Sequence, residues 1–336
     1  TQATEAGTVY APDEVAALAK GLLAFGKRHV KIPMVGRTHL QPAMPSSVGV
    51  WATGYAETLL DDLVMVEAAY TYNDRCPLGS AAGYGVPLPI DRGLTARLLG
   101  FSAPHHNVFH ASNVRGKNEA VLLAACSQLM LTMSRLSEDL ILFSMPEFGY
   151  FSLPPELCTG SSIMPQKYNP DVLELIRGKT ALVLGLGTAA NTLLKAMPGG
   201  YNRDLQDTKE LYMDGLRITR SSLRILTLMT ASLKVNPERL RAGFTPGVFA
   251  TDYALELVAG GMPFREAYQH VRSHLDDLAT ADPDVAIAAK THEGTTAGLD
   301  FEGYGARVRD VTKWVNEKRR RSHAAFNKLL EKKLFN

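Results

Sequence analysis

The sequence has few of the features that mark several common classes of protein. Its 336 residues include only three cysteines, Cys76, Cys126 and Cys158, none of them in a C-x-x-C spacing. We therefore expect neither a disulfide framework nor a zinc knuckle, and this cysteine usage is typical of a reducing cytoplasm. No run of about 18 consecutive apolar residues occurs, so we expect no membrane-spanning helix. The first ten residues lack the basic start and apolar core of a signal peptide.

An excess of charge of either sign is also absent. The chain carries 36 Lys plus Arg against 34 Asp plus Glu, for a formal net charge of +2. Such a balance offers no basic surface for nucleic acid or for an anionic membrane, so we expect neither partner. Hydrophobic residues make up 46% of the chain, which is enough for a large core and excludes a disordered or fibrous protein.

Alternation of the kind seen in β-strands is nearly absent, and helical spacing dominates. One apolar series steps by four and three residues from Leu122 to Phe143, and a second does so from Tyr212 to Leu233. Sustained alternation of four and three is typical of the seam between long helices packed at shallow angles. We therefore predict an all-α fold whose long central helix bundle covers residues 1–238. Further helical patterns cover residues 13–29, 48–72 and 170–196.

The pattern changes after Asn236-Pro237, where we predict a smaller C-terminal helical domain over residues 239–336. Two shorter helices, a polar segment with scattered glycines and a final helix are expected, in that order, over residues 239–269, 271–279, 281–305 and 306–334. The polar segment 35–47 and the Gly- and Pro-rich segment 77–91 are expected to be loops.

Residues 159–170 combine the features of an anion-binding site. A Gly-Ser-Ser loop leads into a helix start, for which we expect Asn169 as the N-cap and Pro170 as the first helical residue. Helix N-termini present unpaired N–H groups and a positive dipole end, which favour carboxylates. Lys167 adds a positive charge, so the segment could stabilise negative charge that develops on a substrate. Taken two at a time, these residues more often form an ordinary capped turn.

The complete segment resembles the sequence signature of a known superfamily. Residues 160–170, Gly-Ser-Ser-Ile-Met-Pro-Gln-Lys-Tyr-Asn-Pro, resemble the G-S-S-x-M-P-x-K-x-N-P signature of the fumarase/aspartase superfamily. Residues 36–42, Gly-Arg-Thr-His-Leu-Gln-Pro, are similar to its G-x-T-H-x-Q segment. Other segments are similar to the argininosuccinate lyase branch in particular, in family order: 77–80 with 89–92, 134–140, 201–210, and 250–252 with 263–267.

The resemblance implies an elimination that releases fumarate from a succinyl compound without a metal or an organic cofactor. It makes Ser161 the base, and a serine serves as a base only when cations and N–H donors stabilise its negative form. Ser162, Lys167, Asn169 and the loop amides are suited to hold the doubly negative carboxylate of the intermediate.

A second group surrounds His39. A lone histidine in a loop is most often a surface or bracing residue, but the resemblance makes His39 catalytic, as a proton donor or as an orienter of substrate. An imidazole suits either role because it titrates near neutral pH. Thr38 and Gln41 are implied to bind substrate. A glutamate in the place of Glu174 pairs with this histidine in the superfamily, and it also suits the dipole of a helix start.

A third group comprises Tyr201, Gln206 and Lys209. Gln206 and Lys209 are three residues apart on an expected helix and would share a face, which on its own suggests a solvated surface. The resemblance implies that all three bind the arginine half of argininosuccinate. It also implies a homotetramer whose active sites each use three chains. The apolar seams agree, because such helices have more apolar surface than a monomer easily buries.

Three departures from the family pattern keep other functions open. A Ser-Arg-Asn-Asp motif expected ahead of His39 is absent, which we interpret as a missing N-terminal domain, and a fragment is a better explanation than a diverged form. Residues 112–118 replace a segment that often carries aspartate, and Tyr168 stands where a lysine is common. The alternatives are a lyase acting on another N-substituted aspartate and an inactive structural homologue.

The remaining candidates have plain structural explanations. His105, His106 and His110 cluster in a loop, but a metal site needs further ligands, so we expect none. Cys158 has no neighbouring base in the sequence and is expected to be a small buried residue.

Overall fold

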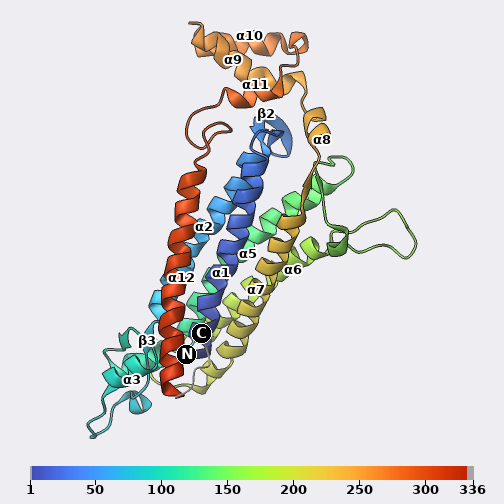
Figure 1. Ribbon diagram of the computed structural model, residues 1–336. Coiled ribbons are helices and arrows are strands. Elements are labelled where there is room, and N and C mark those ends of the chain that lie inside the picture. The colour runs from blue at the N-terminus through green and yellow to red at the C-terminus, as the bar shows by residue number, and fades with distance from the viewer. Residues whose placement is uncertain (1, 331–336) are drawn as a thin grey trace.

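The computed structural model describes residues 2–330, with side chains from Ala11 onward. Long helices run side by side and form a tall bundle, with short elements gathered at its two ends (Figure 1). The predicted all-α fold is confirmed, and the helical patterns of the sequence correspond to long helices. These are α1 (Gln2–Arg28), α2 (Val48–Asn73), α5 (Lys117–Ser144), α6 (Asp171–Leu194), α7 (Thr208–Ser232) and α12 (Phe301–Leu329).

The two predicted seams form the centre of the core. On α5, all seven residues of the series from Leu122 to Phe143 are buried, and Met133, Leu136 and Leu140 have no exposed surface. On α7, Leu223 and Leu226 are fully buried as well. One hydrophobic cluster joins these residues to apolar side chains of α1, α2 and α6. Because apolar burial supplies most of the favourable free energy of folding, this cluster holds the long helices together.

Helix α5 is long and apolar enough to cross a membrane by length and composition alone. However, 67% of its apolar window is buried against the neighbouring helices, which is the environment of a core helix. Its apolar character is therefore explained by the bundle.

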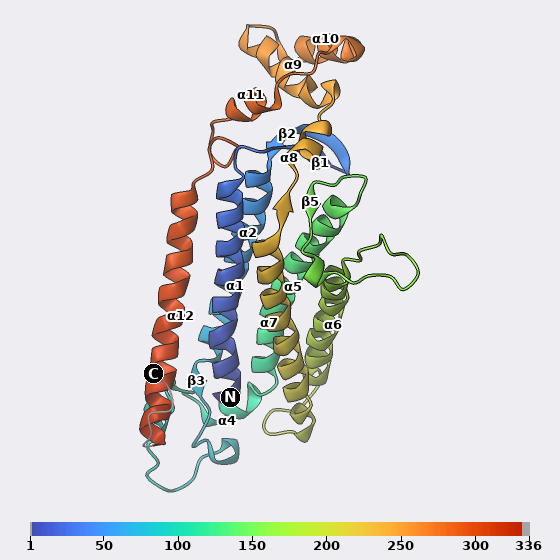
Figure 2. The same cartoon turned by 45° about the vertical axis from the view of Figure 1, so that its right-hand side comes forward.

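The first correction concerns residues 35–47, which we expected to form a loop. They belong instead to an antiparallel hairpin of β1 (Pro33–Thr38) and β2 (Gln41–Ser47), with an irregularity after Gly36. The hairpin lies at one end of the bundle (Figure 2). Two prolines in β2 hid the strand pattern, since proline removes a ladder donor and is expected only at strand edges. The other strands are two-residue pieces: β3 (Arg75–Cys76), β4 (Ala103–Pro104), β5 (Phe151–Ser152) and β6 (Lys234–Val235).

The second correction concerns the C-terminal segment. The helix expected over 239–269 is broken, because Gly243 and Pro246 interrupt it first and Gly260, Gly261 and Pro263 do so again. Of the resulting short helices, the first and last pack against the hairpin, and the middle two stand beyond it, as the orange ribbons of Figure 1 show. In chain order they are α8 (Pro237–Ala242), α9 (Ala250–Ala259), α10 (Phe264–Ser273) and α11 (Pro283–Ala288).

The last helix returns to the bundle. Helix α12 runs along α1 and α2, and its Tyr304 hydroxyl donates to the Glu57 carboxylate at 2.8 Å while Arg307 pairs with Asp61 at 2.6 Å. Its predicted end at residue 334 lies outside the described residues.

The division of the chain at residue 238 stays a prediction. At the opposite end of the bundle lie α3 (Arg92–Leu98) and α4 (Val108–Asn113).

We predict that Leu136→Ala lowers the free energy of unfolding by about 3 kcal/mol, because it leaves a cavity in the centre of the α5 seam. Urea denaturation followed by circular dichroism measures the loss. Leu94→Ala is the matched control, since Leu94 is 46% exposed on α3, and its effect should stay within about 0.5 kcal/mol. Equal losses in the two variants would contradict a core centred on the seam.

Candidate functional site

The loop 159–170 is held closed at its base. The backbones of Thr159 and Asn169 pair in an antiparallel bridge, with N···O distances of 3.1 and 2.8 Å, and the Thr159 hydroxyl bonds to the Asp171 carboxylate. This pairing keeps Asn169 extended, so the expected N-cap is wrong. Helix α6 begins at Asp171 with Pro170 as its N-cap, and no side chain caps it. The Asn169 side chain instead donates to the Gly160 carbonyl at 3.4 Å.

Beyond this closure the loop projects from the bundle, as the green loop beside α6 in Figure 2 shows. Ser161 is half-buried, and its Oγ accepts the backbone N–H groups of Ile163 and Met164 at 3.3 and 3.1 Å. Hydrogen bonds of this kind favour the negative form of the acceptor, as a serine base requires. Ser162 and Lys167 are exposed on the same loop, so they are free to meet a substrate.

His39 lies at the tip of the β1–β2 hairpin. His39 and Leu40 both have positive φ, 53° and 62°, as a two-residue turn between twisted strands requires. The Arg37 guanidinium braces this turn: it donates to the Leu40 carbonyl at 3.0 Å and lies 4.8 Å from the centre of the Phe148 ring. Thr38, His39 and Gln41 are all exposed at the tip. The hairpin therefore presents the three predicted residues together.

A cavity of about 540 Å³ lies beneath the hairpin and reaches His39. It is also lined by Arg37, Trp51 and Asp139, which the sequence did not single out as site residues. The Asp139 carboxylate accepts from Trp51 Nε1 at 2.9 Å and from the Tyr55 hydroxyl at 2.8 Å. Burial, with the adjacent Asp139 charge, raises the pKa of Tyr55. These contacts fix the floor below His39.

His39 and its predicted partner do not pair within one chain. Glu174 is exposed in the first turn of α6, and no hydrogen bond or ion pair joins the two side chains among the described residues. Their pairing stays a prediction.

The third group lies at the far end of α6. Tyr201 is 61% exposed in the link that leads to a 3₁₀ turn ending at Gln206, and Lys209 stands in the first turn of α7. Gln206 and Lys209 are thus not on one continuous helix, as we had expected. The adjacent Arg115 guanidinium lowers the pKa of Tyr201, with smaller contributions from Arg203 and Gln206.

The length of helix α6 separates the loop 159–170 from the group of Tyr201, Gln206 and Lys209. Helix α6 has 24 residues, and at about 1.5 Å per residue it spans about 36 Å. The signature loop precedes its first residue and Tyr201 follows its last, so a substrate of amino-acid size cannot touch both in one chain. Figures 1 and 2 show the hairpin, the loop and the α6–α7 link at different heights along the bundle.

Comparison with known proteins identifies the family. A family model described as "Lyase" matches residues 11–185. The argininosuccinate lyase of Sorangium cellulosum (strain So ce56) is 42% identical over 88% of this chain, and that of Xylella fastidiosa (strain 9a5c) is 41% identical over 84%. The chain belongs to the argininosuccinate lyase family. It spans 69% of the Sorangium protein and 63% of the Xylella protein.

Solved structures agree on the fold. An EDDS lyase in complex with formate has a TM-score of 0.86 at 21% identity, over 97% of this chain and 73% of its own. The class II fumarase of Schistosoma mansoni has a TM-score of 0.68 at 18% identity, over 86% of this chain and 68% of its own. These structures confirm the all-α fold. The family model and the sequence relatives confirm the superfamily resemblance and the carbon–nitrogen lyase class.

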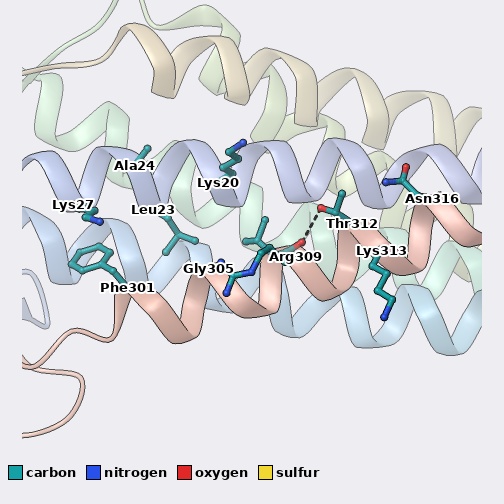
Figure 3. A pocket seen from close by; sticks show the side chains of 11 residues that line it. Lys20, Leu23, Ala24, Lys27, Phe301, Gly305, Arg309, Thr312, Lys313 and Asn316 are labelled. Atoms are coloured by element: carbon teal, nitrogen blue, oxygen red, sulfur yellow. Dashed lines mark hydrogen bonds between the residues drawn. The ribbon is translucent and has the colours of Figure 1, made fainter.

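A larger cavity than the one beneath the hairpin lies elsewhere. A groove of about 770 Å³ runs between α1 and α12, with the side chains of both helices facing it (Figure 3). Lys20, Lys27, Arg309 and Lys313 line it without any carboxylate. None of the residues predicted for argininosuccinate lyase chemistry lies in this groove.

The histidine cluster forms another small cavity, about 360 Å³, near α4. His105 is 7% exposed and its ring meets that of His110 edge-on at 5.1 Å. Burial first, and then the nearby charges of His110 and Arg92, lower the pKa of His105 to about 4. Among residues 2–330 no group of three His, Cys, Asp or Glu side chains is placed to hold a metal ion.

The buried His105 predicts a pH dependence of stability. Because the unfolded chain binds a proton at an ordinary histidine pKa of about 6.5 and the folded chain does not until about pH 4, stability falls as pH drops through this interval. Between pH 7 and pH 5 the free energy of unfolding should fall, and we expect His105→Gln to make that fall about 1–2 kcal/mol smaller. Urea midpoints at the two pH values measure it. His292→Gln, at an exposed histidine, should leave the dependence unchanged, and identical slopes in all three proteins would contradict the assignment.

Proposed function

We propose that the protein cleaves argininosuccinate into arginine and fumarate. The observation that carries the proposal is the loop geometry. Ser161 Oγ accepts two backbone N–H groups on a loop that also carries the exposed Lys167 and is closed by the pairing of Thr159 with Asn169. The argininosuccinate lyases that match most of the chain at 41–42% identity support the choice of substrate.

The first step removes a proton from the carbon next to a substrate carboxylate. The Ser161 alkoxide takes this proton, and the electron pair moves into the carboxylate, which becomes doubly negative. Lys167, Asn169 and the loop N–H groups stabilise that charge, and such stabilisation is effective because it increases as the charge develops. Closure of the projecting loop over the substrate would exclude water and bring these groups together.

The second step breaks the carbon–nitrogen bond. The electron pair returns to form the double bond of fumarate, and the departing guanidino nitrogen receives a proton. We propose that His39 donates this proton or orients the substrate, and that Glu174 of a neighbouring chain pairs with the imidazole. A carboxylate partner fixes the imidazole tautomer and favours its charged form. Thr38 and Gln41, at the same hairpin tip, would hydrogen-bond the substrate.

The arginine half would lie against Tyr201, Gln206 and Lys209. Phenol, amide and ammonium groups offer donors, and the phenol and amide oxygens also accept, so they suit an α-amino acid end, and all three side chains are exposed. With the fumarate half held by Ser162, Lys167 and Asn169, both ends of the substrate have partners.

These groups can meet only if chains assemble, and we propose a homotetramer with active sites shared between chains. Helix α6 exposes Leu175 and Leu182, 59% each, which lie seven residues apart on one face. The neighbouring α7 exposes Met213 and Leu228 at 62% and 57%. Exposed apolar residues concentrated on adjacent helices are typical of an interface. The cytoplasm is the proposed location, since the three cysteines form no disulfide in the described part of the chain.

A second candidate is a lyase for another N-substituted aspartate. The observation that favours it lies within residues 112–118, a stretch that differs from the family pattern: its Asn113 contacts the Tyr201 segment by accepting the Gly200 N–H at 2.6 Å. A changed wall there would alter which substrate tail the site accepts, and it would leave binding of the fumarate half unchanged.

We predict that Ser161→Ala lowers kcat for argininosuccinate at least about 1,000-fold, because no base remains. Fumarate formation is followed by its ultraviolet absorbance, and gel filtration should show an unchanged assembly. Ser221→Ala is the control, an exposed serine on α7. Full activity in the Ser161 variant would refute its role. Fumarate from another aspartate adduct alone would select the second candidate, and no turnover of any adduct would indicate an inactive homologue.

Shared sites predict recovery of activity in mixed assemblies. Chains carrying Ser161→Ala and chains carrying Gln206→Ala should each be nearly inactive, yet co-assembled they should exceed the sum of the parents. The reason is that some active sites then combine the intact Ser161 loop of one chain with the intact tail subsite of another. The tail subsite is the group of Tyr201, Gln206 and Lys209. In the control, chains with Ser161→Ala are mixed with chains that carry both substitutions. No chain in this mixture has Ser161, so no activity should be recovered. No recovery in the first mixture would contradict sharing between chains.

A further inference from the structure

Helix α4 and the residues after it form a wall beside the Tyr201 segment. The Asn113 Oδ1 accepts the Gly200 N–H at 2.6 Å, although these residues are far apart in the chain. Phe109 lies so close to Gly199 that a Cβ there would stand 2.7 Å from its ring. The turn at Gly199-Gly200 is therefore held by one hydrogen bond and one close aromatic contact, both from α4.

The same wall reaches Tyr201 itself. The Arg115 guanidinium lies over the Tyr201 ring, 4.8 Å from its centre, and is half-buried while the ring is 61% exposed. A guanidinium in this position is attracted to the face of the ring and limits the directions in which the ring can turn. Lys117, two residues later, is exposed and has no hydrogen bond or ion pair with the described residues.

A sharp bend between α4 and α5 places Arg115 there. Gly116 is buried at φ 78°, a left-handed conformation that glycine adopts without strain. A Cβ at Gly116 would stand 2.8 Å from Leu205 and 2.9 Å from Leu194, so the bend packs directly against both neighbours of the Tyr201 segment. The wall and the segment thus form one packed unit.

We propose that Arg115 and Asn113 are positioning residues that determine how the enzyme binds the amino-acid tail of its substrate. This inference rests on the proposed function, in which Tyr201 contacts the tail. Arg115 sets the direction of the Tyr201 ring and Asn113 sets the turn before it, so that the hydroxyl faces the substrate. The substrate class is an N-substituted aspartate whose substituent ends in an α-amino acid group, and the fumarate half of the site does not depend on this wall.

The two products of the reaction allow the two half-sites to be tested separately, because arginine binds to one and fumarate to the other. Arginine and fumarate are tested as inhibitors of the full-length enzyme with argininosuccinate as substrate. We expect Arg115→Met to raise the inhibition constant of arginine about fivefold, since the stacked cation is lost, and to leave that of fumarate within about twofold. Arg115→Lys, which keeps the charge but not the planar group, should raise the arginine constant less. Asn113→Ala should act like Arg115→Met, and Lys117→Met should change neither constant.

An unchanged arginine constant in Arg115→Met, or an equal rise of both constants, would overturn the positioning role while turnover by the unaltered enzyme still supports the proposed function. Failure of the unaltered enzyme to release fumarate from argininosuccinate would instead refute the proposed function, and the inference with it.

Discussion

Burial of the apolar seams along α5 and α7 is the constraint on which the rest of the structure depends. Since Met133, Leu136 and Leu140 have no exposed surface, α5 stays aligned with its neighbours over its whole length. Helix α6 is held between α5 and α7 and spans about 36 Å without interruption. The groups at its two ends are therefore fixed far apart, and the same rigidity that separates them in one chain would hold them in register between chains.

The side chains proposed for the chemistry stand where these rigid elements end. The signature loop is closed by a backbone bridge at Thr159, the hairpin tip is braced by Arg37, and the tail subsite packs on the bend at Gly116. Each device uses backbone hydrogen bonds or close packing within the chain. Such support holds a site in one geometry before the substrate arrives, which is how binding energy can be directed to the transition state.

The accuracy of the sequence interpretation varied with the range of the interactions involved. The seams were predictable because each apolar residue of a long helix repeats the same local pattern. The hairpin was missed because Pro42 and Pro45 mask its second strand and because His39 and Leu40 are unusual turn residues. The capping role given to Asn169 was wrong because its backbone is used in a bridge to Thr159, ten residues earlier.

The sequence by itself determined that the chain is a helix bundle and which short motifs tie it to the argininosuccinate lyase family. Both depend on local order: a repeating period and a contiguous string of residues. Only the tertiary structure decided that α4 packs against the turn at Gly199-Gly200, and that Arg115 covers the Tyr201 ring. These relations arise from packing between residues distant in the chain, and no local pattern records which distant surfaces will meet.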